Sequence, residues 1–336
     1  MPTPFRLTEA ADLYDPAIQK MFLKASELDD KNFEKFCNVE TGVEDYITKD
    51  SSLSGLGEAA RISPENASIV GESPVQGFDQ TYTQVEYGKL LAFTKKMWKF
   101  GIKKRDMTRV TKELYKACVR KRERLLTEKL ENGWSTSYSH VDDGGNYTVT
   151  LSGADSVAMF SASHTREDGG TAWNNIITDG TTVNMDFDYD ALKAARRTAS
   201  LIKDPKGNPL SVQYDTFIFA RGSSASFRAQ EILGAIKKAH RPGTISAGDA
   251  GYDGPGVQAF STIELPYMTN LEYYFGMDSS LKGETYGIQY MESQPIELEG
   301  PNLVFKTGEI QYKSTVMFAY GHTDARNMGG SKGTNS

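Results

Sequence analysis

The chain has 336 residues, with 38 Lys and Arg, 44 Asp and Glu, and a net charge of −6. This length allows a substantial core and suggests about two domains. The charge is unevenly spread, because residues 89–129 hold 15 Lys and Arg but four Asp and Glu, a net +11 that leaves −17 for the rest. Such asymmetry predicts an acidic partner, namely nucleic acid, a membrane surface or acidic patches on copies of the same protein.

Two classes of protein are disfavoured by simple counts. No apolar run approaches the roughly eighteen residues that span a bilayer, and the N-terminal sequence has no basic start followed by an apolar stretch, so it does not resemble a secretion signal. The two cysteines, Cys37 and Cys118, are too few for a disulfide framework. We therefore expect both to be buried thiols of an intracellular protein.

Residues 1–54 predict an arm rather than a domain. Asp15 and Pro16 form a cap followed by a first-turn proline. One short apolar face follows, made of Ile18, Phe22, Ala25 and Leu28. This surface is too small for a core of its own, so we expect the arm to become ordered by lying on another part of the protein.

Residues 55–100 predict a projecting β-hairpin. A turn-rich segment precedes an alternating run that places Phe78, Tyr82 and Tyr87 among polar residues. The sequence offers no helix to cover these strands. Because an isolated two-stranded hairpin is marginally stable, this one is expected to need a neighbouring subunit.

Residues 106–133 predict a helix of roughly 40 Å at 1.5 Å per residue. Asp106 or Thr108 can serve as the N-cap, and Asn132 with Gly133 ends the helix. The apolar stripe consists of Val110, Leu114, Tyr115, Cys118, Val119, Leu125, Leu126 and Leu130. The other faces carry Arg109, Lys112, Lys116, Arg120, Lys121, Arg122, Arg124 and Lys129.

The remainder of the chain predicts an α+β arrangement. Residues 134–185 read as strands and loops, with a glycine turn between two short alternating runs. Residues 186–300 alternate helices with strands, including a buried strand at 216–220 and a helix at 223–239. Two further strands are expected near the end, and the last residues, 328–336, are predicted to be a disordered tail.

Several catalytic or metal-binding patterns fail on inspection. Asp186, Asp188 and Asp190 have the spacing that opens a calcium loop, but the sixth position is Ala191 and the twelfth is Arg197, so helix capping is favoured. Ser223 and Ser224 lack the flanking glycines of a nucleophile elbow, and helix capping is again the better interpretation. The glycine-rich loop 248–256 has no following Lys-Ser/Thr, so an exposed loop is expected instead of a phosphate cradle.

The four histidines, at positions 140, 164, 240 and 322, show no metal-ligand spacing. His164 stands near Glu167 and Asp168, which leaves open the hypothesis of a metal-dependent or hydrolytic enzyme. The alternative is a hydrogen-bonded structural histidine at the end of an apolar run.

The basic helix also has two interpretations, a solvated face or a surface for an acidic partner. No recognised nucleic-acid-binding motif accompanies the charge, so any contact with DNA would be non-specific. The candidate assembly or DNA-facing residues are Lys112, Lys116, Arg120, Lys121, Arg122 and Arg124. Replacing Arg120, Lys121, Arg122 and Arg124 with glutamate is predicted to impair assembly and to leave the subunit folded.

The order of parts, together with four stretches, resembles the major capsid proteins of tailed bacteriophages, with the Hong-Kong-97-type fold. The closer likeness is to Mu-type major head subunits. The stretches are residues 89–97 (KLLAFTKKM); 159–164 (MFSASH) with the loop to Asn175; the helix from Tyr189 ending at 204–210 (DPKGNPL) before the strand at 216–219; and Tyr273-Tyr274-Phe275 before Met277-Asp278.

This resemblance implies an α+β capsid fold with a defined division of the chain. Its implied parts are an N-terminal arm (1–54), an extended β-hairpin loop (55–94), a spine helix with the peripheral domain (95–185), an axial domain (186–300), a return strand of the peripheral domain (301–325) and a flexible tail (326–336). The arm is too short to include a scaffolding segment, so the scaffold would be a separate protein or one already removed.

The resemblance further implies a structural subunit without catalytic residues, cofactor or metal. Pentamers and hexamers would close into an icosahedral shell around double-stranded DNA, assembled in the host cytoplasm and found in the virion, with scaffold, portal and possibly decoration proteins as partners. Some relatives join neighbours through a Lys–Asn bond, for which Lys89 or Lys95 with Asn327 have suitable residue types. An encapsulin-like nanocompartment shell remains the alternative with the same fold.

Overall fold

The computed structural model describes residues 18–53 without 28 and 30, 76–94, 104–239, 259–283 and 286–334, and single residues at 56, 59, 71, 73, 74 and 97. For residues 104–108 and 235–239 only the backbone is described. Leu28, Lys95, the expected hairpin tip and the loop 248–256 lie outside the described residues.

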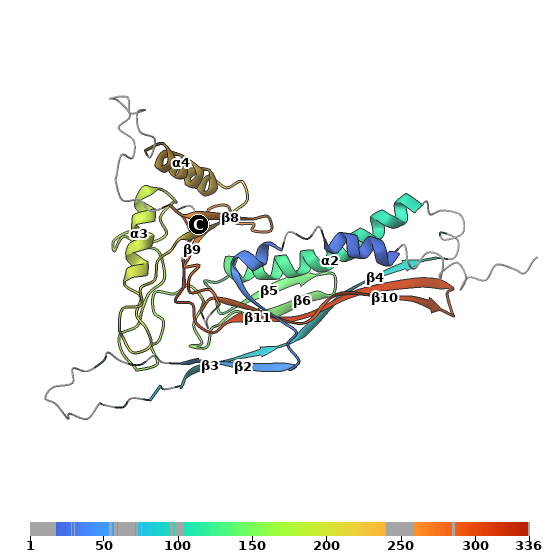
Figure 1. Cartoon of the computed structure of the whole chain (residues 1–336), viewed down its shortest axis with the longest axis horizontal. Helices are drawn as coiled ribbons and strands as arrows, with labels where there is room; N and C mark the ends of the chain where they lie inside the picture. Colours follow the sequence, from blue (N-terminus) through green and yellow to red (C-terminus); the bar gives the residue numbers. More distant parts are fainter. Residues whose placement is uncertain are drawn as a thin grey trace, which may run out of the picture.

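The described chain is an α+β structure with an elongated part and a broader body (Figure 1). The elements of the elongated part are η1 (Asn32–Lys35), β1 (Cys37–Thr41), β2 (Ile47–Leu53), β3 (Gln76–Thr83), β4 (Val85–Phe93), α2 (Lys104–Glu131), β5 (Ser137–Asp142), β6 (Gly145–Thr150), β10 (Ile288–Val304) and β11 (Glu309–His322). The elements of the body are α3 (Tyr189–Ser200), β7 (Thr216–Ala220), α4 (Ser224–Ala239), β8 (Ser261–Leu265), β9 (Tyr274–Met277) and β12 (Met328–Ser331).

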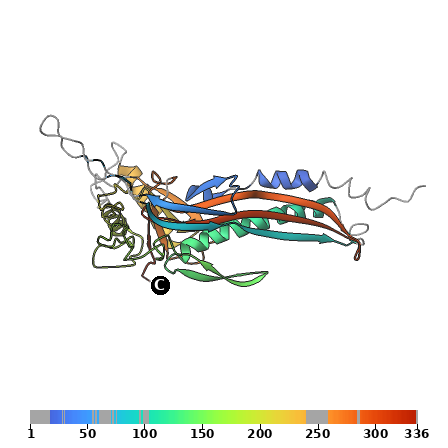
Figure 2. The ribbon, with the colours of Figure 1, turned by 90° about the horizontal axis from the view of Figure 1, so that it is seen from below.

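The elongated part is built on a sheet of four strands in the order β1-β10-β11-β4. β10 and β11 form a long antiparallel hairpin, and β4 continues the sheet along β11. β1 pairs in parallel with β10 along residues 288–292, and in the described part of the chain no strand pairs with the rest of β10 on that side. Figure 2 shows the long strands of this sheet side by side, with α2 behind them.

The predicted long helix is confirmed as α2, and its apolar stripe faces this sheet. The helix begins at Lys104, so the expected N-caps Asp106 and Thr108 lie inside the helix and do not cap it. Leu114 of α2 packs with Phe93 of β4 and with Ile310 and Tyr312 of β11. Cys118, Leu125, Leu126 and Leu130 join the main core. The helical period of the apolar residues therefore decides which side of α2 is buried, as the sequence predicts.

The expected dependence of the arm on the rest of the protein is also confirmed. Residues 18–26 are helical. Ile18 packs beside Leu114, and Phe22 and Ala25 pack against Tyr115, with the rings of Phe22 and Tyr115 5.0 Å apart in an edge contact. The arm thus covers a second face of α2.

The projecting hairpin is formed by different strands from those expected. β3 pairs with β2, which belongs to the predicted arm, in the register Ile47↔Thr83 to Leu53↔Gln76. β4 instead pairs with β11 inside the large sheet. The alternating run at 78–87 spans both strands and crosses Gln84, where the chain leaves one sheet for the other, so period alone did not separate them.

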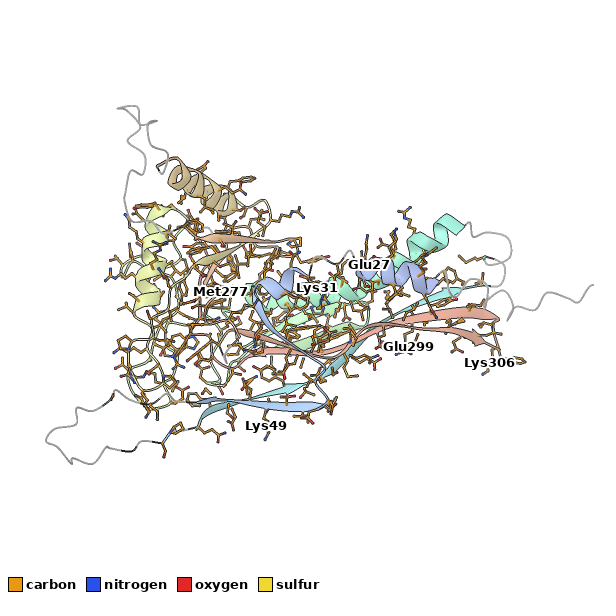
Figure 3. The ribbon with its side chains drawn as sticks, in the orientation of Figure 1. Glu27, Lys31, Lys49, Met277, Glu299 and Lys306 are labelled. Atoms are coloured by element: carbon orange, nitrogen blue, oxygen red, sulfur yellow. The ribbon has the colours of Figure 1, made fainter. Side chains whose placement is uncertain are left out.

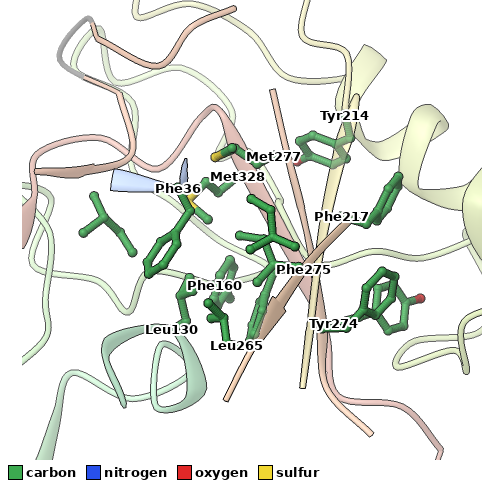
Figure 4. Close-up of a cluster of buried hydrophobic side chains, with 14 of the residues drawn as sticks. Phe36, Leu130, Phe160, Tyr214, Phe217, Leu265, Tyr274, Phe275, Met277 and Met328 are labelled. Carbon is green, nitrogen blue, oxygen red and sulfur yellow. The ribbon is translucent and has the colours of Figure 1, made fainter. Parts of the chain in front are cut away.

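The body contains the second four-stranded sheet, in the order β12-β9-β7-β8. α3 packs near β12, and α4 near β7 and β8. All five residues of β7 are buried. Figure 4 shows the buried side chains around this sheet, including Phe217, Tyr274 and Phe275, together with Leu130 at the end of α2. One continuous core therefore joins the two parts of the molecule.

The prediction of a disordered tail is wrong. Residues 328–331 form β12, which pairs with β9 and is buried along its whole length. A Cβ atom on Gly329 would lie 2.5 Å from the Tyr214 hydroxyl, and one on Gly330 would lie 3.1 Å from the rings of Phe160 and Phe275. Glycines are needed here because aromatic rings occupy the space where side chains would be.

Two boundaries of the predicted division differ from the strands observed. β10 begins at Ile288, within the segment 186–300, yet it lies in the long sheet with β11. β1 likewise places part of the arm in that sheet. In the described part of the chain, no helix is long and apolar enough to cross a membrane.

Candidate functional site

The candidate site is the exposed side of α2, which the sequence predicts to be basic. Lys116, Arg120 and Arg124 have side chains that are 59, 52 and 48 % exposed. Lys112 is half-buried. Together the four form a row with a spacing of four residues, which runs along one side of the helix.

Two carboxylates reduce the charge of this row. Glu113 lies 3.6 Å from the Lys116 ammonium and 3.3 Å from the Arg120 guanidinium. Glu128 accepts a hydrogen bond from Arg124 Nε at 2.7 Å. Four cations against these two anions leave the exposed side of α2 positive.

Arg122 does not belong to this exposed row, contrary to the sequence-based assignment. Its side chain is 4 % exposed, and its guanidinium lies 2.7 Å from Asp29 of the arm, which is equally buried. The guanidinium also stacks 4.2 Å from the ring of Phe33. Arg122 therefore ties the arm to α2, and the acidic partner of this residue is within the same chain.

Lys121 is also largely engaged within the chain. Its ammonium lies 2.8 Å from His140 Nε2 and donates hydrogen bonds to Asp142 (2.6 Å) and the Tyr147 hydroxyl (3.0 Å). Because an ammonium group has no acceptor, His140 Nε2 must accept, and His140 Nδ1 then donates to Glu128 at 2.5 Å. Lys121 thereby fixes the β5–β6 hairpin on α2.

Lys129 is the most buried cation of the helix, with 1 % exposure. It donates one hydrogen bond to the Leu151 carbonyl at 2.7 Å. Burial lowers the pKa of Lys129 from 10.5 to about 7. The pKa of His322 is well below its usual range, mainly because its side chain is buried and secondly because the charge of Lys129 is close.

Two hollows lie along the exposed side of α2 and share Arg124 and Tyr267 in their walls. One, of about 670 Å³, is bounded by β4, α2 and the turn of the β5–β6 hairpin. The other, of about 800 Å³, is bounded by β5, the end of α2 and residues 266–273. They form a groove that joins the elongated part to the body.

His164 is placed by the structure in a protein-only hydrogen-bond network. Its Nδ1 lies 2.8 Å from Asp155 and its Nε2 lies 3.2 Å from Asn175 Oδ1, and the ring stacks 4.1 Å from Trp173. Both ring nitrogens thus have protein partners, and His164 is 2 % exposed. This arrangement fits the structural interpretation.

The carboxylates near His164 are also engaged. Glu167 accepts from Ser52 at 3.0 Å and lies 3.2 Å from Arg326, whereas Asp168 pairs with Arg166. Among the described residues, no group of three or more His, Cys, Asp or Glu could hold a metal ion. Glu167 instead links β2 of the projecting hairpin to the buried Arg326.

The two residue types proposed for a crosslink have very different settings. Lys89 is half-exposed and pairs with Asp143 of the β5–β6 turn. Asn327 is 1 % exposed. Its side chain packs against Gly287, where an added Cβ atom would lie 2.7 Å from the Asn327 amide nitrogen. Asn327 is therefore inaccessible to a lysine of another copy, and the structure argues against a Lys89–Asn327 bond.

The structure confirms the capping roles of Asp188 and Ser223 and the burial of both cysteines. Asp188 caps α3 by accepting from the Ala191 amide at 2.7 Å, and the Ser223 hydroxyl accepts from the Ser226 amide at 3.1 Å at the start of α4. Cys37 and Cys118 are free and buried, and burial raises the pKa of both thiols.

Asp29 and Asn175 have structural roles that the sequence did not predict. Asn175 donates to the carbonyls of Met159 (2.8 Å) and Met328 (3.2 Å), which joins the 159–164 loop to β12. An isolated Asn or Asp carries no periodic signal, so only the tertiary contacts identify these two residues.

Comparison with known proteins identifies the fold through structure alone. No protein-family model matches the chain, and no curated protein sequence matches it. The capsid structure of cyanophage P-SCSP1u is similar over 90 % of this chain and 88 % of its own, with 12 % identity and a TM-score of 0.51.

Two further solved structures are similar at lower TM-scores. A structure from Mycobacterium phage Adephagia is similar over 91 % of this chain and 90 % of its own, with 13 % identity and a TM-score of 0.48. The virus-like particle from Pyrococcus furiosus is similar over 94 % of this chain and 98 % of its own, with 8 % identity and a TM-score of 0.46. The cyanophage comparison confirms the predicted capsid fold, and the narrower likeness to Mu-type subunits stays a prediction.

Proposed function

We propose that this chain is the major capsid subunit of a tailed bacteriophage. In this proposal, pentamers and hexamers of the chain close into an icosahedral shell around double-stranded DNA in the host cytoplasm and remain in the virion. The observation that carries the proposal is the fold shared with the cyanophage capsid structure over about nine-tenths of both chains. Fold alone does not define function, so the features of this chain must support the same role.

The shape of the chain supports assembly. The β2–β3 hairpin extends from the body as a two-stranded sheet, and β4 and most of β10 are edge strands of the large sheet (Figure 1). Unpaired strand edges present backbone donors and acceptors that a second chain can satisfy. Such edges suit a subunit that is surrounded by copies of itself.

The row Lys112, Lys116, Arg120 and Arg124 supports a non-specific contact with the enclosed DNA. Their spacing along α2 covers about 18 Å at 1.5 Å per residue, and the side chains of the last three are half-exposed. A positive row without a base-reading motif fits phosphate contacts that do not depend on sequence.

The proposal includes a scaffold and a portal as partners and allows for decoration proteins, and it assigns no catalytic residue, cofactor or metal. It also requires no crosslink between copies, because Asn327 is buried. The enzyme alternative has lost its main support, since Asp155 and Asn175 occupy both nitrogens of His164.

Electron microscopy of the expressed chain, alone and with the neighbouring phage genes, tests this function. Closed particles with five- and sixfold clusters are expected, and particles from infected cells should contain DNA. Particles that enclose a cargo protein and no DNA would support the nanocompartment alternative instead. A chain that stays monomeric under all of these conditions would contradict both shell functions.

A further inference from the structure

The β5–β6 hairpin leaves one strand edge without a partner among the described residues. The Thr136 carbonyl accepts a hydrogen bond from the Leu151 amide at 2.7 Å, in the same register as the β5–β6 ladder. Because bonded and non-bonded pairs alternate along an antiparallel ladder, the even-numbered residues of β5 bond to β6. The backbone groups that point away from β6 are those of Ser137, Ser139 and Val141.

The hollow of about 800 Å³ runs beside this edge. Its apolar lining comes from β5 and from the segment that connects β8 to β9, and consists of Tyr138, Val141, Pro266, Tyr267, Met268 and Tyr273. Val141 is 55 % exposed. A strand edge next to a groove with aromatic walls is the arrangement that binds an extended peptide by adding a strand.

The end of the β10–β11 hairpin has the complementary properties. Phe305 is 98 % exposed and Leu303 is 45 % exposed. Figure 3 places the neighbouring Lys306 at the far end of the elongated part, away from Met277 in the body. Beyond residue 292, β10 has no strand partner on this edge among the described residues, because β1 ends at Thr41.

We propose that the end of this hairpin in one copy binds the groove beside β5 in a second copy. The free edge of β10 near Leu303 pairs with the outward edge of β5, and Phe305 enters the groove between the tyrosines. The inference rests on the proposed shell function, because it needs copies held side by side. Burial of a phenylalanine and a few edge hydrogen bonds would stabilise such a contact.

Charges on the two surfaces are compatible with this contact. The hairpin end carries Lys306 and Glu309, and the groove carries Glu128, Glu131 and the half-exposed Arg124. Each surface thus offers groups of both signs, which permits pairing of opposite charges across the contact.

The two surfaces occupy different places on the chain, so the contact is heterologous. Each copy offers its hairpin end to one neighbour and its groove to another. A heterologous contact produces a closed ring when the rotation between copies closes. The hairpin-to-groove contact would therefore help to define the ring or the junction between rings in the shell.

A disulfide test addresses the contact directly. In the variant Val141→Cys with Leu303→Cys, Phe305 is kept and the contact brings the two new thiols of adjacent copies together, and the native Cys37 and Cys118 are buried and do not compete. Mild oxidation of assembled particles should give a ladder of linked subunits on non-reducing gels, at least tenfold more than in a control. The control is Leu303→Cys with Leu201→Cys, since Leu201 is 67 % exposed and lies outside the groove.

A second variant separates this inference from the shell function. Phe305→Asp leaves the fold intact because the side chain is 98 % exposed and buries nothing within its own chain, and it should lower the yield of closed particles at least tenfold. Particles that form normally from Phe305→Asp, or linkage of the test pair no greater than in the control, would overturn the inference and leave the shell function standing. Failure of the unaltered chain to assemble would overturn the shell function itself.

Discussion

At the scale of single residues, the cations of α2 have three different roles. Arg120 and Arg124 face solvent, Lys121 and Arg122 hold other segments of the chain, and Lys129 is buried in the core. Composition and period identify the cluster, but the role of each residue depends on its neighbours. The four-residue glutamate variant proposed from the sequence therefore mixes surface charges with structural ones.

Arg122 and Arg120 provide a matched comparison. Arg122→Met leaves the buried Asp29 carboxylate without its counter-charge, and such a change typically costs about 3–5 kcal/mol. Arg120→Met removes a half-exposed cation and should change the free energy of unfolding by less than about 0.5 kcal/mol. Urea unfolding of unassembled subunits measures both, and equal effects of the two variants would contradict the assigned roles.

Lys129 predicts a dependence of stability on pH. Its pKa in the folded chain is about 7, below the unfolded value near 10.5, so the unfolded chain binds the additional proton between these values. Stability from this group consequently rises with pH from about 7 to about 10.5, and below about 7 the buried charge carries its full cost. Each unit by which the folded-state pKa lies below the unfolded value corresponds to about 1.4 kcal/mol of folding free energy.

Replacement of this lysine checks the direction of the effect. Lys129→Met removes the buried charge, so at pH 7 the variant should unfold at a higher temperature than the unaltered chain. The difference should shrink as the pH approaches 10, because Lys129 of the unfolded chain then also begins to lose its proton. Melting curves across pH 7–10 give the comparison, and a difference that stays constant with pH would show that Lys129 does not titrate there.

At the scale of elements, the sequence predicts segments with a clear period, but it does not predict which strands pair. The stripe of α2 has a clear helical period, and both its existence and its buried side are as expected. β12 has no such signal, because its sequence is Met-Gly-Gly-Ser. It forms a strand because the ring of Tyr214 lies over Gly329, and that contact joins residues 115 positions apart in the chain.

The candidate site likewise has features that the sequence predicts and features that depend on tertiary contacts. The basic row could be read from the sequence because charge is a property of each residue and the spacing is helical. The burial of Arg122 and Asn327 could not, since Asp29 and Gly287 lie far from them in sequence. Local periodicity places a residue on a face, but only the tertiary partners decide whether that face is open to another molecule.

At the scale of the whole molecule, the two sides of the elongated part differ in charge. The basic row lies on α2, and the outward side of the sheet behind it carries Glu86 and Glu299, with Lys313 between them. In a shell around DNA, this polarity favours the orientation in which α2 faces the nucleic acid. Arg124 belongs to both the row and the groove, whereas Lys112, Lys116 and Arg120 lie outside the groove of about 800 Å³ and would be left for DNA.

Neutralising the row tests this orientation. The variant Lys112→Gln, Lys116→Gln, Arg120→Gln and Arg124→Gln should weaken binding of assembled rings to random-sequence DNA. It should also lower the salt slope of log K by up to about 0.9 for each phosphate that the row no longer neutralises. A control with the same change in charge elsewhere is Lys31→Gln, Lys35→Gln, Lys49→Gln and Lys193→Gln, all at exposed positions. If both variants reduce the slope equally, the row acts only through net charge. If neither does, DNA contacts another surface of the subunit.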